Sequence, residues 1–137
     1  MAVDIKKDQS KDLELLTDGS WTSPTCEVLD PDGSTLSTPT ATLDSTATTV
    51  ASAASSYQIT LASASGFVVG RWYKVVTDGV TSLFKVIRIS SNDITISPAL
   101  SITPEGSDPV TGVMVSVTVP AASTGDLGTG YQVILSE

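Results

Sequence analysis

Two apolar runs separated by Asp78-Gly79 are the feature that most constrains the fold of this chain. The runs are 71–77, RWYKVVT, and 80–89, VTSLFKVIRI. A two-residue Asp-Gly between such runs predicts a β-hairpin, because both turn residues tolerate the positive φ angles that the tight turn requires. Each run places large apolar side chains on both of its faces. That pattern predicts central strands of a sandwich or barrel, and not a sheet with one wetted face.

Shorter alternating segments extend the β pattern over most of the chain. Turn residues separate them, among which Gly70, Asp32 and Gly33 join Asp78 and Gly79 as structural turn positions. The expected strands cover 25–29, 34–36, 57–61, 71–77, 80–89, 94–96, 113–119 and 131–135. The sequence therefore predicts an all-β fold, an antiparallel β-sandwich or partly open barrel of about seven to nine short strands.

The domain organisation follows from length and pattern. The chain has 137 residues, which suits one domain. Residues 1–19 lack a core pattern and are predicted to form a flexible N-terminal arm, followed by a single β domain over 20–137. Residues 57–100 form a compact meander within it or, as an alternative, a small barrel inserted into a sandwich. Residues 37–56 are rich in serine, threonine and alanine and are read as a loop, an edge strand or, over 49–56, a short helix.

Catalysis and metal binding find little support in the composition. The sequence has no histidine and one cysteine, Cys26. Ser-His-Asp and Cys-His catalysis and histidine or CxxC metal sites are therefore excluded. Asp30 and Asp32 resemble part of a calcium loop but lack the further ligands of an EF-hand, so a capped β-turn is favoured. We predict a protein that is not an enzyme and that uses no cofactor and no metal.

The charges are unevenly distributed along the chain. The net charge is −8, which disfavours nucleic acid as a specific partner. Beyond residue 11, every basic residue lies in 71–88. These residues either decorate ordinary solvated strands or meet an acidic surface of a neighbouring copy or another partner. On the second interpretation the candidate interface residues are Arg71, Lys74, Lys85 and Arg88, together with Trp21 beside a turn.

Targeting signals are not evident in the sequence. The longest uncharged run, 45–70, is too polar for a membrane span. The first residues contain no apolar core of a secretory signal. We therefore expect neither membrane association nor export by that route.

Three stretches of this sequence resemble structural proteins of tailed bacteriophages. Residues 57–100 contain a Gly-x-x-Tyr, a V-x-D-G hairpin and an ITI-x-x-x-L strand, in that order. Residues 112–137, GVMVSVTVPAASTGDLGTGYQVILSE, and 25–36, TCEVLDPDGSTL, fit the closing strands and an early hairpin. The resemblance spans most of residues 20–136, although 37–56 match no part of it.

The resemblance implies a virion structural subunit that is assembled in the host cytoplasm. Its expected place is a ring at the head–tail neck, as a connector, head-completion or collar protein. The implied partners are copies of itself and other virion proteins, namely portal, adaptor or tail proteins. The residues carried over, Gly70, Tyr73 and Gly79, are structural. Capsid decoration, a tail-tube component or fibre attachment is an alternative within the virion, and a carbohydrate-binding or adhesin β-sandwich is an alternative of another class.

Overall fold

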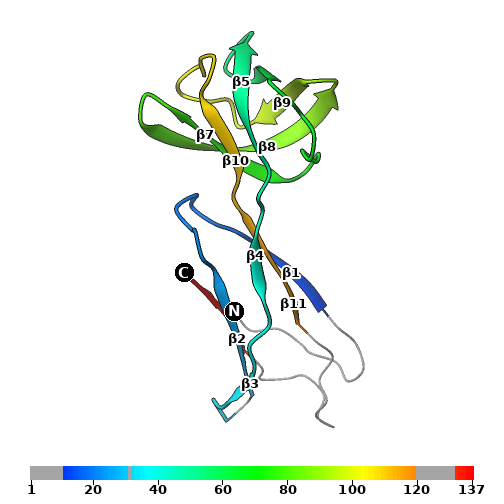
Figure 1. The fold of residues 1–137 in the computed structure, drawn as a ribbon, viewed down its shortest axis with the longest axis vertical. Coiled ribbons are helices and arrows are strands. Elements are labelled where there is room, and N and C mark those ends of the chain that lie inside the picture. Colours follow the sequence, from blue (N-terminus) through cyan, green and yellow to red (C-terminus); the bar gives the residue numbers. More distant parts are fainter. Residues whose placement is uncertain (1–10, 31, 120–131) are drawn as a thin grey trace. The chain divides into compact units, whose positions relative to one another are not determined.

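Twelve β-strands make up the protein in a computed structural model that describes residues 11–30, 32–119 and 132–137 (Figure 1). Those residues contain no helix. The predicted all-β class is confirmed.

Residue contacts divide the chain into two compact units. The barrel unit comprises Leu16–Ser20 and Asp44–Met114. The sandwich unit comprises Met1–Leu15, Trp21–Leu43 and Val115–Glu137. The middle of the chain thus folds as one unit, and the sequence on both sides of it supplies the other.

The barrel unit contains a closed six-stranded barrel. Its antiparallel strands follow the order β10-β5-β6-β9-β8-β7, and β10 closes the ring because it pairs with both β5 and β7. The strands are β5 (Ala47–Ala53), β6 (Gln58–Leu61), β7 (Trp72–Thr77), β8 (Val80–Ser90), β9 (Asp93–Ser97) and β10 (Pro109–Gly112). In Figure 1 they run from cyan-green to orange.

Aromatic and branched aliphatic side chains fill the barrel. Tyr73 and Phe84 are completely buried, with their ring centroids 6.2 Å apart, and Phe67 lies 4.4 Å from Tyr73. Strict alternation along β7 directs Tyr73, Val75 and Thr77 inward. Burial of this apolar surface is the main favourable contribution to folding of the unit.

The turn between β7 and β8 adopts the backbone that its sequence favours. Asp78 has φ 51° and Gly79 has φ 77°. Two successive positive φ angles give the turn a twist that matches the strands on either side. The pairing Thr77 with Val80 continues to Trp72 with Lys85 without interruption.

The sandwich unit is built from two three-stranded sheets, in the orders β1-β11-β4 and β12-β2-β3. Its buried core contains Cys26, Val28 and Val133 from the sheet β12-β2-β3 and Val117 from the sheet β1-β11-β4. The strands are β1 (Lys11–Leu16), β2 (Thr25–Leu29), β3 (Thr35–Ser37), β4 (Ala41–Leu43), β11 (Met114–Val119) and β12 (Gln132–Ser136).

Several expectations from the sequence need correction. The described strands exceed the predicted seven to nine, because β1, β4, β5 and β10 were not among the predicted strands. Within 37–56, where a loop, an edge strand or a short helix was expected, β4 is an edge strand and β5 is a strand of the barrel. The barrel is closed and not partly open. It also extends beyond 57–100, since β5 and β10 lie outside that range.

The ends of the expected domain differ as well. Residues 11–16, assigned to the arm, form β1, whose Leu13 packs against the sandwich core. Residues 1–10 of the arm lie outside the described residues, as does Tyr131 at the start of the strand expected over 131–135. The strand expected over 113–119 corresponds to β11, whereas β10, which ends just before Val113 and pairs within the barrel, was not expected.

Candidate interaction surface

The four basic residues of 71–88 all lie in the barrel unit. Because alternation sends Tyr73 and Phe84 into the barrel, Lys74 and Lys85 project from its outer face. A register shift between Val86 and Arg88 interrupts the pairing of β8 with β9. After this irregularity two successive residues, Ile87 and Arg88, are exposed on the outside.

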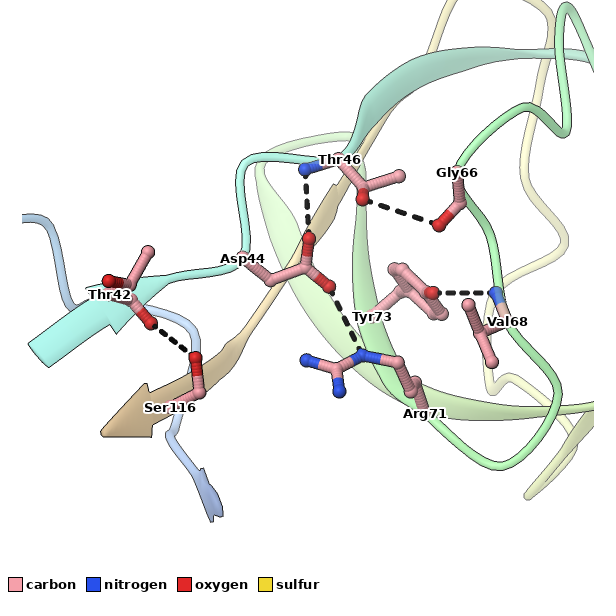
Figure 2. A network of polar contacts seen from close by, with 8 residues as sticks. All are labelled: Thr42, Asp44, Thr46, Gly66, Val68, Arg71, Tyr73 and Ser116. Atoms are coloured by element: carbon pink, nitrogen blue, oxygen red, sulfur yellow. Dashed lines mark hydrogen bonds and ion pairs between the residues drawn. The ribbon is translucent and has the colours of Figure 1, made fainter. Parts of the chain in front are cut away.

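Arg71 takes part in an internal polar network. Its Nε lies 3.5 Å from Oδ2 of Asp44, and the two side chains are 25% and 12% exposed. The other carboxylate oxygen of Asp44 accepts the amide of Thr46 at 3.0 Å (Figure 2). Asp44 therefore joins the start of β5 to the start of β7, and Arg71 is a structural residue of the barrel.

Lys74 is engaged by the short segment Leu16–Ser20. Its Nζ donates a hydrogen bond to the carbonyl of Gly19, and a Cβ on Gly19 would lie 3.1 Å from Cδ of Lys74. The same Cβ would lie 3.5 Å from Leu83. This segment thus covers the outer face of β7 and β8 at Lys74, and explains why both faces of the hairpin carry apolar side chains.

Further hydrogen bonds, to Val113 and within the segment, hold the covering segment in place. Thr17 is buried, and its hydroxyl donates to the carbonyl of Val113 at 2.8 Å. Asp18 accepts hydrogen bonds from the amide and hydroxyl of Ser20, and these bonds lower the pKa of its carboxyl. The covering of Lys74 is therefore built into the barrel unit.

Lys85 and Arg88 differ from the other two basic residues. Among the described residues, neither forms an ion pair or a side-chain hydrogen bond. Lys85 lies between Trp72 of β7 and Ser97 of β9, and Arg88 lies opposite Thr95.

Apolar side chains accompany these two cations. Ile87 is 48% exposed, and Trp72 is half-buried beside Lys85. We name Trp72, Lys85, Ile87 and Arg88 the basic face. The loop bearing the exposed Val68 and Val69 is tied to β8 next to it, because the amide of Gly70 donates to the carbonyl of Val86 at 2.7 Å. Tryptophan, arginine and exposed aliphatic groups are the residue types that interfaces use.

The structure thus separates the residues that the sequence grouped. Trp21 is half-buried and belongs to the sandwich unit, whereas the four basic residues belong to the barrel unit. The sequence pattern did not single out Ile87, Val68 or Val69. In the sequence these three residues are apolar like the core residues around them, so the sequence alone could not show that they are exposed.

The predicted turn positions occupy two turns and a loop. Gly70 has φ 91° in the loop before β7, and Asp78 and Gly79 form the hairpin turn. In the sandwich unit, Gly33 has φ 85°, and the carboxylate of Asp30 accepts the amide of Asp32 at 3.0 Å. Asp30 therefore caps that turn, and its carboxylate also accepts the amide of Ser34 at 3.0 Å.

Other chemistry in the described part of the chain is sparse. Cys26 is buried in the sandwich core, and this burial raises the pKa of its thiol. Across residues 11–30, 32–119 and 132–137, no three metal-ligating side chains come together. The same residues include no helix with the length and apolar character needed to span a bilayer.

Comparison of the chain with protein-family models, with curated proteins and with solved structures found no match.

Proposed function

We propose that this protein is a non-enzymatic structural subunit of a tailed-phage virion, assembled into a ring at the head–tail neck. The observation that carries the proposal is the basic face. It presents two cations without ion-pair partners among the described residues, next to exposed apolar side chains, on a chain whose net charge is −8. Such a surface favours an acidic protein partner and fixes the register of docking.

The architecture is consistent with a building block. Closure of the barrel pairs every strand of that sheet on both sides, so none of its six strands is an edge strand. A rigid body of this kind can carry a contact surface whose geometry does not change on docking. The resemblance of residues 20–136 to phage structural proteins supplies the biological setting.

The test is to look for the protein in particles produced from the genome that encodes it. Purified tailed particles are analysed by mass spectrometry, and antibody-coated gold is used to locate the protein by electron microscopy. We expect the protein in the particles and gold at the junction of head and tail. Protein that is abundant in producing cells but absent from purified particles would refute the proposal. Gold over the head or along the tail would favour the decoration or tail-tube alternatives.

A further inference from the structure

The outer face of the sheet β1-β11-β4 in the sandwich unit is polar and hollowed. A hollow of about 450 Å³ lies on this sheet. The inward side chains Leu13, Ala41 and Val117 belong to the core of the unit. Hydroxyls and carboxylates make up most of the lining of the hollow, together with Leu13 and Val117. The polar groups come from Asp12, Glu14, Thr40, Thr42, Ser116 and Thr118.

The two carboxylates of this lining can only accept hydrogen bonds when ionised, whereas the hydroxyls can both donate and accept. Asp12 and Glu14 are exposed, and Asp12 accepts a hydrogen bond from the hydroxyl of Thr118 at 2.8 Å. Ser116 lies 3.5 Å from the carbonyl of Thr42 (Figure 2). A concave surface of carboxylates and hydroxyls is chemically suited to guanidinium and ammonium groups, which carry only donors.

The charges of the two units are complementary. The described residues of the sandwich unit include six carboxylates, at Asp12, Glu14, Glu27, Asp30, Asp32 and Glu137, and a single basic residue, Lys11. The free cations of the chain's described part, Lys85 and Arg88, lie on the barrel unit.

From this complementarity we propose that the basic face of one copy docks into the polar hollow of a second copy. The inference rests on the proposed function and specifies the partner of the basic face as the protein itself. Lys85 and Arg88 reach toward Asp12 and Glu14, while Ile87 and Trp72 supply apolar area beside them. The contact uses two different surfaces, so it is head-to-tail, and repetition gives a ring if the rotation closes and a filament if it does not.

Mixing two variants of the full chain tests this arrangement. The basic-null variant carries Lys85→Ala and Arg88→Ala, and the hollow-null variant carries Asp12→Asn and Glu14→Gln. Asparagine and glutamine retain an acceptor oxygen, so the bond from Thr118 is kept. Light scattering and sedimentation equilibrium at low salt measure the association.

We expect the wild type to self-associate, and to do so less as salt rises. Each variant should associate about tenfold more weakly, which is the effect expected for loss of two exposed ion pairs. An equimolar mixture should form a dimer and no larger species, because only one contact in it has both intact faces. This last result distinguishes contact between copies from contact within one copy.

Matched controls guard against a general effect of charge. Asp32→Asn with Glu105→Gln removes two other exposed carboxylates, and Lys85→Arg with Arg88→Lys keeps both cations. Both controls should associate like the wild type. Circular dichroism checks that each variant is folded, and the salt dependence of the wild type is a readout that requires no variant.

Three results would overturn the inference: a wild type that is monomeric at every concentration and salt, variants that associate as well as the wild type, or a mixture that stays monomeric. Each of them would leave the proposed function intact if the protein is found in virions. Conversely, a self-associating protein that is absent from virions would refute the proposed function and not this contact.

Discussion

Gly112 lies against the Asp44 network and offers a direct test of its importance for the barrel unit. A Cβ added at this position would lie 2.5 Å from Cγ, 2.6 Å from Cβ and 2.7 Å from Oδ2 of Asp44. Gly112 is buried, and its amide donates to the carbonyl of Thr46 at 2.9 Å. In Gly112→Ala the carboxylate of Asp44 must therefore move away and, because the Cβ of Asp44 is fixed to its backbone, one of the two backbones must shift as well.

The expected cost combines two effects. Forcing a methyl group into a packed site costs about 1–3 kcal/mol. Moving the carboxylate also breaks its hydrogen bond with the Thr46 amide and its ion pair with Arg71, and a bond to a charged group contributes about 1.5 kcal/mol. We expect the free energy of unfolding of the barrel unit to fall by about 3 kcal/mol, a large share of a typical stability of about 5–15 kcal/mol.

Urea denaturation followed by tryptophan fluorescence measures this loss. Trp72 lies in the barrel unit and Trp21 in the sandwich unit, so a Trp21→Phe background makes the signal specific for the barrel. With a urea slope of about 1.5 kcal/mol per M, the midpoint should fall by about 2 M.

A double-mutant cycle identifies the cause. Asp44→Gly removes both the carboxylate and the Cβ that the new methyl group would meet, so Gly112→Ala should cost less than about 1 kcal/mol in that background. Asp44→Ala keeps the Cβ at 2.6 Å and should not relieve the clash. Gly106→Ala is the control, since its added Cβ meets one atom, the carbonyl oxygen of Ala51 at 3.2 Å. An equal loss in the wild-type and Asp44→Gly backgrounds would show that the reasoning is wrong.

Two further substitutions test the barrel core and its hairpin turn. Burial raises the pKa of Tyr73, so its neutral form stabilises the fold fully below the unfolded pKa of about 10, and this stability is lost as pH rises above it. Tyr73→Phe removes the acceptor of the Val68 amide and should lower the free energy of unfolding by about 1 kcal/mol at pH 7. In urea titrations it should also make the loss of stability above pH 10 shallower, and an equal loss in both proteins would contradict this. Tyr57→Phe, at an exposed position, is the control. Gly79→Val should destabilise by about 1–3 kcal/mol in thermal unfolding, because a β-branched residue is strained at φ 77°. Gly79→Asn should lose less than half as much, and equal losses would point to another cause.

The clearest local patterns in the sequence correspond to strands whose partners are close along the chain. Asp78-Gly79 specifies β7 and β8 because the turn residues and both apolar runs are contiguous. β5 is harder to recognise, since Val50 is its one buried residue and its partners include the distant β10. In the case of β1 the signal existed, because Leu13 and Leu15 alternate with Asp12 and Glu14. Because the residues around it are charged, this alternation was interpreted as part of a flexible arm.

The sequence identified a cluster of basic residues, but it could not show which of them contact other parts of the fold. All four basic residues lie in the stretch 71–88, and the pairs Arg71 with Lys74 and Lys85 with Arg88 each consist of one lysine and one arginine. Asp44 and Gly19, which engage the first pair, come from chain segments whose positions depend on closure of the barrel.

This division has a consequence for experiments on the basic cluster. Replacing Arg71 or Lys74 removes an ion pair or a hydrogen bond inside the barrel unit, whereas replacing Lys85 or Arg88 removes no ion pair or side-chain hydrogen bond that the described residues make. The first pair should therefore affect stability in proportion to the lost contacts, and the second pair should affect association at unchanged stability. Charge reversal at Arg71 and Lys85 together would mix the two effects. Association is therefore best tested through Lys85 and Arg88, the cations that form no ion pair or side-chain hydrogen bond with the described part of the chain.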